Sequence, residues 1–249
     1  MRKLSIIGIG AGNPDYITVQ AIRALETLDV LFLIDKGEEK DDLAKLRREI
    51  CERYIKKPFR FVEAKDPERD RKPASYEAAV TTWHDKRAAI YEAMIREELA
   101  DGQQGAFLVW GDPSLYDSTL RIVHQVAAMK TVAFELDVIP GITSVQALAA
   151  RHKIALNRIG GPIHSTTGRL LANKGLPADD VVVMLDGDCA FKTVKDTGVE
   201  IYWGAYVGTA DEILVSGKLE ERGPEIEKIR SDARARHGWI MDTYLLRKN

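Results

Sequence analysis

The sequence has few cysteines, little net charge and no long apolar run. Its two cysteines, Cys51 and Cys189, are too few and too far apart for a disulfide framework or a cysteine-rich metal site. Lys and Arg total 36 against 38 Asp and Glu, so no overall basic field attracts nucleic acid or anionic lipid. No apolar segment approaches the ~20 residues that cross a bilayer, and a strand pattern begins directly after Lys3 without a signal peptide. We therefore expect a cytoplasmic protein with no membrane, nucleic-acid or metal partner.

The first part of the chain alternates apolar runs with amphipathic segments. A continuous apolar run such as Leu4–Ile9 predicts a strand buried on both faces of a parallel sheet. The predicted strands are 4–9, 30–34, 59–62, 106–109 and 132–139, and the predicted helices are 18–28, 41–57, 76–99, 117–129 and 143–152. This alternation predicts an α/β domain over residues 1–156 with a mostly parallel sheet.

The pattern changes after Arg158, where glycine and proline become frequent. Predicted strands at 181–185, 200–207, 213–216 and 239–246 follow one another, with one helical stretch near 224–236. Such an order is typical of a mixed α+β domain, which we place at residues 157–249.

Three strand-to-loop junctions are rich in glycine and proline. They are Gly8-Ile-Gly-Ala-Gly-Asn-Pro14, Trp110-Gly-Asp-Pro113 and Ile139-Pro-Gly-Ile-Thr-Ser144. Open α/β sheets bind ligands beyond the carboxyl ends of their strands, so the junctions predict a ligand cleft there. The first loop has the spacing G-x-G-x-G and lacks the G-x-G-x-x-G that opens a dinucleotide-binding helix. Asp35 after the second strand keeps a dinucleotide site open as an alternative, beside a purely structural turn.

In this order and spacing, the three motifs resemble the tetrapyrrole methylase family, the class III S-adenosylmethionine (SAM) methyltransferases of sirohaem, cobalamin and diphthamide synthesis. The segment 202–217 is similar to a late strand–turn–strand of the family, and the resemblance covers the whole chain. Trp110, Trp203-Gly-Ala-Tyr206 and the ending 238–245 are most similar to a branch that acts in aerobic cobalamin synthesis. The resemblance implies two α/β domains with a SAM cleft between them, a homodimer, and C-methylation of a precorrin with loss of acetate.

The resemblance also implies which residues bind SAM. Asp112 would accept hydrogen bonds from the ribose hydroxyls, although Gly-Asp-Pro is also common turn chemistry. The backbone after Gly111 and the helix start at Thr143 and Ser144 would donate to the methionine carboxylate, although the last two are equally suited to helix capping. An apolar slot for adenine would use Leu115, Tyr116, Met184, Tyr206 and Val207, of which Met184 suits a plain core position as well.

The first glycine loop departs from the family, where it borders the tetrapyrrole and is usually Gly-Pro-Gly-Asp-Pro. Ala11 stands in place of the proline and Asn13 in place of the aspartate. The resemblance therefore implies substrate contact by Gly10 and Gly12, but the carboxylate proposed to assist catalysis is absent. Asp15 lies two residues further on.

Loss of acetate requires a water molecule to attack a carbonyl group. We expect the residue that orients it among Asn13, Asp15, Tyr16, His164 and Asp186, with Asn13, Asp15 and the loop residue His164 as the catalytic candidates. A substrate with many carboxylates favours arginine contacts. The candidates are Arg69, Arg158 and Arg169, beside Arg71 and Lys72; each is also explained as ordinary surface charge.

Other functions remain open at this point. A second class III methylase activity, on another precorrin or uroporphyrinogen, on diphthamide or on ribosomal RNA, fits the same motifs, although the balanced charge disfavours RNA. An NAD-linked oxidoreductase and a non-catalytic corrinoid carrier are the alternatives from other classes, because a fold alone does not fix a function.

Overall fold

The computed structural model describes residues 1–35, 41–68 and 76–248. The chain divides into two compact units: residues 1–10 with 14–142, and residues 11–13 with 143–249. The domain boundary expected at 156/157 falls inside the second unit, because the helix Ser144–His152 packs on strands of that unit. Within the described residues, no helix has the length and apolarity needed to cross a membrane.

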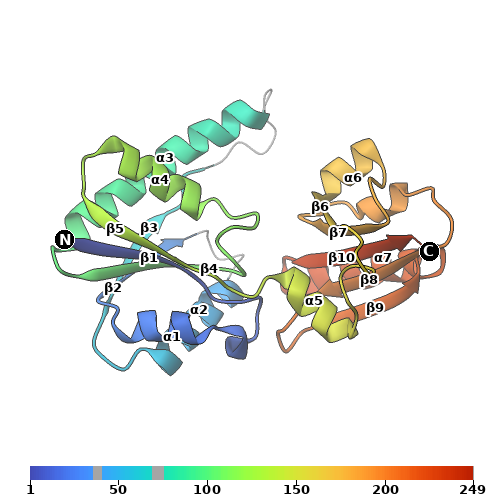
Figure 1. The fold of residues 1–249 in the computed structure, drawn as a ribbon, viewed down its shortest axis with the longest axis horizontal. Helices are drawn as coiled ribbons and strands as arrows, with labels where there is room; N and C mark the ends of the chain where they lie inside the picture. The colour runs from blue at the N-terminus through green and yellow to red at the C-terminus, as the bar shows by residue number, and fades with distance from the viewer. Residues whose placement is uncertain (36–40, 69–75, 249) are drawn as a thin grey trace. The chain divides into compact units, whose positions relative to one another are not determined.

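The first unit contains a five-stranded parallel sheet in the order β3-β2-β4-β1-β5 (Figure 1). Its strands are β1 Arg2–Gly8, β2 Val30–Asp35, β3 Arg60–Lys65, β4 Gln104–Val109 and β5 Phe134–Ile139. Every strand pair in this sheet is parallel. The expected α/β class and the mostly parallel first sheet are confirmed.

Helices cover both faces of this sheet (Figure 1). They are α1 Val19–Glu26 and α2 Asp41–Tyr54 on one face, and α3 Tyr76–Glu98 and α4 Thr119–Met129 on the other. Neighbouring residues of β1 serve opposite cores: Ile6 packs toward α3 and α4, and Ile7 toward α1 and α2. This explains why the strand is apolar at successive positions. Thr18 caps α1 as predicted, accepting a 3.1 Å hydrogen bond from the backbone N–H of Ala21.

The second unit contains a mixed sheet in the order β6-β7-β10-β8-β9. Its elements are α5 Ser144–His152, β6 His164–Thr167, α6 Gly168–Lys174, β7 Asp180–Met184, β8 Val199–Ala205, β9 Ile213–Lys218, α7 Leu219–His237 and β10 Asp242–Lys248. Only β6 and β7 pair in parallel; the other pairs are antiparallel. The expected mixed sheet is confirmed.

The two faces of the second sheet are covered by different helices. Trp203 and Tyr244 belong to a buried core that also includes Ile226 of α7. On the other face, α5 approaches so closely that a Cβ on Gly204 would lie 2.7 Å from Leu148 Cδ1. The unit therefore has its own core, with α5 as an integral part.

Three elements of the second unit differ from the expectation, one of them helix α6, Gly168–Lys174, where no helix was predicted. Strand β6 is His164-Ser-Thr-Thr167, an edge strand without an apolar run, so no hydrophobic pattern marks it. Helix α7 begins at Leu219, before Pro224 rather than at it. Its buried positions are Leu219, Gly223, Ile226, Arg230 and Ala233. This spacing of three and four residues continues through the proline, so packing of one helix face outweighs its local effect.

Candidate functional site

The three glycine-rich segments meet at the carboxyl edge of the first sheet. Gly10 after β1 and Gly111 after β4 form an antiparallel bridge, in which Gly111 N donates to Gly10 O at 2.9 Å and Gly10 N to Gly111 O at 3.3 Å. The segment after β5 joins them through Gly141, whose backbone N–H donates to the Asp112 carboxylate at 2.8 Å. The expectation that these motifs gather at one sheet edge agrees with this geometry.

Glycine is required in this group because the backbones approach too closely for side chains. A Cβ on Gly141 would lie 2.0 Å from the carbonyl oxygen of Gly111, and a Cβ on Gly8 would lie 2.6 Å from Gly141 N. Gly10 and Gly111 also have left-handed φ angles of 81° and 69°. Backbone polar groups, rather than side chains, are therefore the main features at this edge.

Asp112 joins two of these segments. Its carboxylate accepts 2.8 Å hydrogen bonds from the backbone N–H groups of Ser114 and Gly141, and a third bond from the Ser114 hydroxyl. Partial burial raises the pKa of Asp112, but these hydrogen bonds outweigh burial and leave the pKa below its ordinary value. Asp112 is therefore ionised at neutral pH, and a carboxylate with about four acceptor positions retains one for a ligand.

Two aromatic residues flank Asp112. The indole Nε1 of Trp110 is buried and has no hydrogen-bond partner within the part of the chain that the structure describes. A buried N–H donor without an acceptor is unusual and is satisfied when a ligand supplies one. Tyr116 has a left-handed φ of 53° and is 42% exposed, while Leu115 is partly buried. This segment thus presents aromatic surface beside an ionised carboxylate.

The start of α5 is a complete capping box. The Thr143 hydroxyl accepts from the backbone N–H groups of Val145 (3.2 Å) and Gln146 (3.5 Å), and the Gln146 side chain accepts from Thr143 N at 3.0 Å. The capping role weighed for Thr143 is therefore observed, and its hydroxyl is already used. Ser144 is partly buried, and its hydroxyl makes no hydrogen bond to any residue that the structure describes.

Tyr206 and Val207 are buried in the turn that follows β8. The Tyr206 hydroxyl donates to the carbonyl oxygen of Trp239 at 2.6 Å, which fixes the ring although its backbone φ is left-handed at 49°. The Glu212 carboxylate accepts from Gly208 N at 2.8 Å and holds the other side of the turn.

Gly12 of the first loop packs against the same turn. A Cβ on Gly12 would lie 2.7 Å from Thr209 Cγ2 and 2.8 Å from the carbonyl oxygen of Val207. The role in substrate contact expected for Gly12 stays a prediction, whereas its close packing on this turn is a structural reason for glycine.

Left-handed backbone marks the predicted cofactor segments. Six non-glycine residues in the described ranges have positive φ, and two of them, Lys130 and Lys153, are helix C-caps. The other four are Tyr116, Leu185, Cys189 and Tyr206. Two of these are predicted cofactor residues, and Leu185 directly follows a third, the partly buried Met184. Such strain is concentrated at functional sites in proteins, and the assignment of these segments to the cofactor stays a prediction.

The catalytic candidates lie in different surroundings. Asp15 is exposed and forms a 2.8 Å ion pair with Arg53 of α2. Asn13 is partly buried beside Gly12. His164 is exposed and begins strand β6, so its expected placement in a loop was wrong.

Asp186 is the one buried residue among the water-orienting candidates. It is 6% exposed, and its carboxylate accepts hydrogen bonds from the Tyr244 hydroxyl at 2.7 Å and from the backbone N–H groups of Ala190 (2.7 Å) and Asp188 (3.0 Å). This burial argues against Asp186 as the residue that orients the water molecule.

The arginine candidates are dispersed along the chain. Arg158 and Arg169 are both exposed, and Arg158 Nε lies 4.0 Å from the buried carboxylate of Asp180. Arg69, together with Arg71 and Lys72, lies outside the described residues. Within those residues, no group of three or more His, Cys, Asp or Glu is arranged to hold a metal ion.

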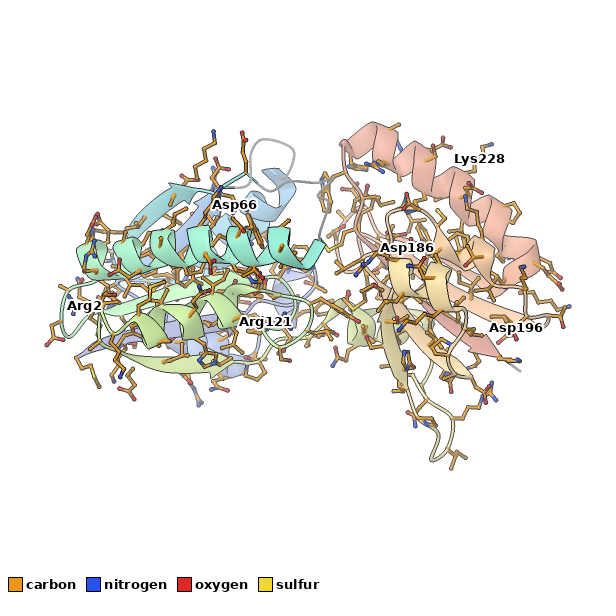
Figure 2. All side chains as sticks on the ribbon, turned by 90° about the horizontal axis from the view of Figure 1, so that it is seen from above. Arg2, Asp66, Arg121, Asp186, Asp196 and Lys228 are labelled. Atoms are coloured by element: carbon orange, nitrogen blue, oxygen red, sulfur yellow. The ribbon has the colours of Figure 1, made fainter. Side chains whose placement is uncertain are left out.

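Sequence reasoning missed a buried cluster that supports the segment after β4. Arg87 of α3 is 3% exposed and donates to Asp66 at 2.8 Å and to Ser118 Oγ at 3.2 Å. The ring of Trp83 lies 4.4 Å from its guanidinium carbon. Asp66 follows β3 and lies beside α3 (Figure 2). The sequence does not indicate this cluster, because a charged residue such as Arg87 in a long helix normally lies on a face exposed to solvent.

Comparison with known proteins agrees with these features. A family model described as Tetrapyrrole (Corrin/Porphyrin) Methylases matches residues 3–222. The chain is 55% identical to the precorrin-6A synthase [deacetylating] of a Sinorhizobium species over 251 residues, which covers 100% of this chain and 96% of that protein.

Solved structures show the same fold. A structure described as a cobalamin synthesis related protein (CobF) from Corynebacterium diphtheriae has a TM-score of 0.85 and 40% identity, covering 100% of this chain and 99% of that one. A Thermus thermophilus uroporphyrin-III C-methyl transferase complexed with S-adenyl homocysteine has a TM-score of 0.60 and 15% identity, covering 98% and 91%. The latter shows the fold alone. With a family model matched over most of its length, the chain belongs to the tetrapyrrole (corrin/porphyrin) methylase family.

Proposed function

We propose that this protein is a SAM-dependent C-methyltransferase of cobalamin biosynthesis that acts as a precorrin-6A synthase. It methylates precorrin-5 at C-1 and releases acetate. The 55% identity to the Sinorhizobium enzyme of that name, over the whole chain, is the observation that carries this proposal. The 40% identity to CobF over the whole chain adds independent support. We further propose a homodimer in the cytoplasm, with a tetrapyrrole as the small-molecule partner.

The residues of the glycine-rich group fit SAM. Close packing of the backbones at Gly8, Gly111 and Gly141 holds the three segments together, so that the residues beside them keep fixed positions for a ligand. The ionised Asp112 has an acceptor position left for a ribose hydroxyl. The orphan N–H of Trp110 supplies a donor. When bound, SAM supplies a methyl group that is already activated on a sulfonium.

For methyl transfer the main task of the protein is to hold SAM and the substrate in the right relative position. Methyl transfer gains most when the carbon nucleophile is held in line at about 3–3.5 Å from the methyl group. We assign this task to Asp112 and Gly111 at the first sheet, to Ser144 at the start of α5, and to the segments of Met184 and Val207. Asp112 suits the task because its own two hydrogen-bonded segments fix its carboxylate before a ligand arrives.

Loss of the acetyl group consumes one water molecule. Water adds to the acetyl carbonyl, the bond between that carbonyl carbon and the macrocycle breaks, and acetate leaves. A residue that holds this water must present a polar side chain to it. Asp186 is 6% exposed, so its carboxylate has little access to such a water molecule. We retain Asn13, Asp15 and His164 as candidates, and Gly10, Gly12, Arg158, Arg169 and the undescribed Arg69 for contact with the substrate.

Isothermal titration of S-adenosylhomocysteine (SAH), SAM and NAD into the purified protein tests this proposal. We expect micromolar binding of the first two, loss of binding in Asp112→Ala, and no heat with NAD. Ser114→Ala is the matched control, because it removes one structural partner of Asp112 without removing the carboxylate. Binding of NAD without SAM would overturn the proposal and favour an oxidoreductase. Tetrapyrrole binding without SAM binding would favour a carrier.

A further inference from the structure

A turn of unusual conformation joins β7 to the 3₁₀ helix Ala190–Thr193. Leu185 and Cys189 in this turn have left-handed φ angles of 52° and 57°. The left-handed region brings the Cβ of an L-residue such as leucine too close to its own backbone, whereas glycine adopts it freely. The Leu185 side chain is also 65% exposed. The fold therefore gains little burial from a residue that it holds in a strained conformation.

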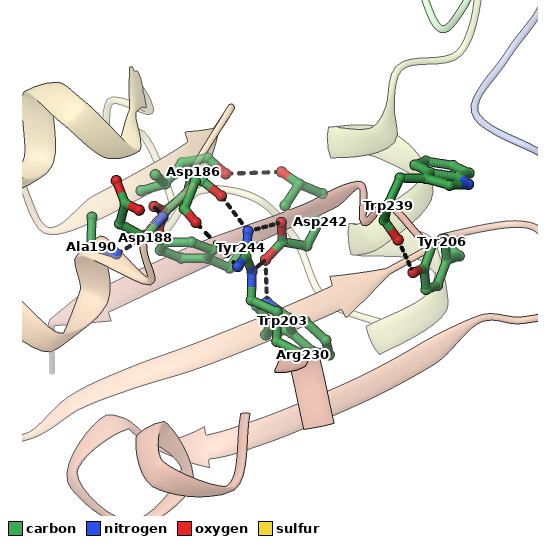
Figure 3. Close-up of polar contacts among 12 residues, drawn as sticks. Asp186, Asp188, Ala190, Trp203, Tyr206, Arg230, Trp239, Asp242 and Tyr244 are labelled. Atoms are coloured by element: carbon green, nitrogen blue, oxygen red, sulfur yellow. Dashed lines mark hydrogen bonds and ion pairs between the residues drawn. The ribbon is translucent and has the colours of Figure 1, made fainter. Parts of the chain in front are cut away.

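The turn is held by a buried arginine (Figure 3). Arg230 of α7 donates through Nη2 to the carbonyl oxygen of Asp186 at 2.6 Å and through Nη1 to that of Gly187 at 3.2 Å. Its Nε donates to the Asp242 carboxylate at 2.9 Å, and both side chains are buried. Trp203 Nε1 donates to the same carboxylate at 2.9 Å. One guanidinium thus links α7 and β10 to the two carbonyl groups that follow Leu185.

The side chain of Asp186 holds the turn from the other side. Its carboxylate accepts from Tyr244 and from the backbone N–H groups of Asp188 and Ala190. Burial and the neighbouring carboxylate raise the pKa of Tyr244, so this phenol stays a neutral donor. The backbone of Gly168 packs directly against the Asp186 side chain, since a Cβ at Gly168 would lie 2.5 Å from Asp186 Cγ. Both backbone and side-chain groups of the turn are therefore fixed without a ligand.

We propose that this turn presents Leu185 as an apolar contact for the adenine of SAM, and that Arg230 is the positioning residue that keeps it there. The inference rests on the function proposed above, because Leu185 directly follows Met184, one of the residues assigned to the apolar slot. Leu185 is exposed and is held in a left-handed conformation by a buried charged network. A flat apolar group that covers Leu185 would bury its side chain and so explain why a leucine is kept at this position. The network then supplies preorganisation, which lowers the entropy lost on binding.

A first variant separates strain from ligand contact. Leu185→Gly removes the apolar side chain and suits the left-handed φ better. We expect a melting temperature equal to or above that of the wild type, but SAH binding weakened by about tenfold, the effect of losing contact with most of one leucine side chain. An unchanged SAH affinity in Leu185→Gly would overturn the proposal.

A second pair of variants separates positioning from stability. Arg247 of β10 is a matched control, because it also donates to one buried carboxylate, Asp180 at 2.6 Å, and to two backbone carbonyl groups, those of Ala155 and Leu156. Arg230→Met and Arg247→Met should both lower the melting temperature. Measured at a temperature where both variants are folded, SAH affinity should fall about tenfold or more only in Arg230→Met. The KM for SAM should rise in step, and Arg230→Lys should restore part of it.

The outcomes distinguish this inference from the proposed function. If wild-type protein binds no SAH, the proposed function fails and the inference fails with it. If the wild type binds SAH and both arginine variants lose affinity equally, only the positioning role is overturned, because general destabilisation then explains the loss.

Discussion

Replacing Gly141 by alanine should destabilise the first unit strongly. The new Cβ would lie 2.0 Å from the carbonyl oxygen of Gly111, and ordinary contact begins near 3.4 Å, so the two segments must separate by about 1.4 Å. The neighbouring atoms are backbone, which cannot rotate away as a side chain does. The separation breaks the bond from Gly141 N to Asp112 and strains the Gly10–Gly111 bridge.

The expected loss is about 4 kcal/mol. Overpacking contributes about 2 kcal/mol, and two weakened hydrogen bonds contribute about 1 kcal/mol each. For a unit of this size, such a loss lowers the melting temperature by about 12 °C, at about 3 °C per kcal/mol. Thermal unfolding followed by circular dichroism measures it, and titration with SAH should show weaker binding.

Gly161→Ala is the control for this experiment. Its Cβ would lie 3.5 Å or more from every neighbour, and its φ is outside the left-handed region, so we expect a change within about 1 kcal/mol. A Gly141→Ala variant that melts within 2 °C of the wild type would refute the reasoning that these backbones are in direct contact.

Three further predictions concern buried groups. Burial raises the pKa of Cys51 to about 12, so iodoacetamide at pH 8 should alkylate Cys51 only after denaturation; rapid labelling of the native protein would contradict this. Burial lowers the pKa of His152, although its ring donates to Trp203 O at 3.0 Å. The contribution of neutral His152 to the free energy of unfolding is thus complete above about pH 6.5 and declines as the pH falls toward the folded-state pKa. His152→Gln should therefore flatten the dependence of the denaturant midpoint on pH between about 7 and 5. An unchanged slope would contradict this prediction. Arg87→Met leaves the largely buried Asp66 without its ion-pair partner and should lower the free energy of unfolding by about 3 kcal/mol. Arg60→Met, which removes an exposed ion pair with Glu98, should lower it by at most about 1 kcal/mol. Equal losses would show that burial does not determine the contribution of these pairs.

Much of the fold could be predicted because its signals are local. Continuous apolar runs marked the strands of the parallel sheet, since each is buried on both faces. Thr18 marked the start of α1 by its capping chemistry. The edge strand β6 could not be found in this way, because its four residues are polar or hydroxyl-bearing and only one is buried.

The candidate site was predictable where close backbone contact demands glycine. Gly8, Gly111 and Gly141 lie within their motifs in the sequence, and the parallel sheet brings those motifs to one edge. The supports of the site were not predictable. Arg230 appears in the sequence as one more charge on a polar helix, and only the fold shows that its guanidinium lies against the turn after β7.

Two aspartates with similar sequence surroundings differ in their burial in the structure. Asp112 and Asp186 are both aspartates beside glycine at the end of a buried strand. Both carboxylates accept three hydrogen bonds, but Asp112 is only partly buried, whereas Asp186 is 6% exposed. The difference lies in tertiary partners such as Tyr244, which is 58 residues away along the chain.

The central claim is that one protein couples methyl transfer to loss of acetate. The most direct measurement is a single turnover of precorrin-5 with methyl-labelled SAM, in which labelled corrinoid, SAH and acetate are all quantified. We predict equal amounts of the three products, and none of them with Asp112→Ala. SAH and labelled product without acetate would identify a different methylase, and acetate without SAH would contradict the coupling altogether.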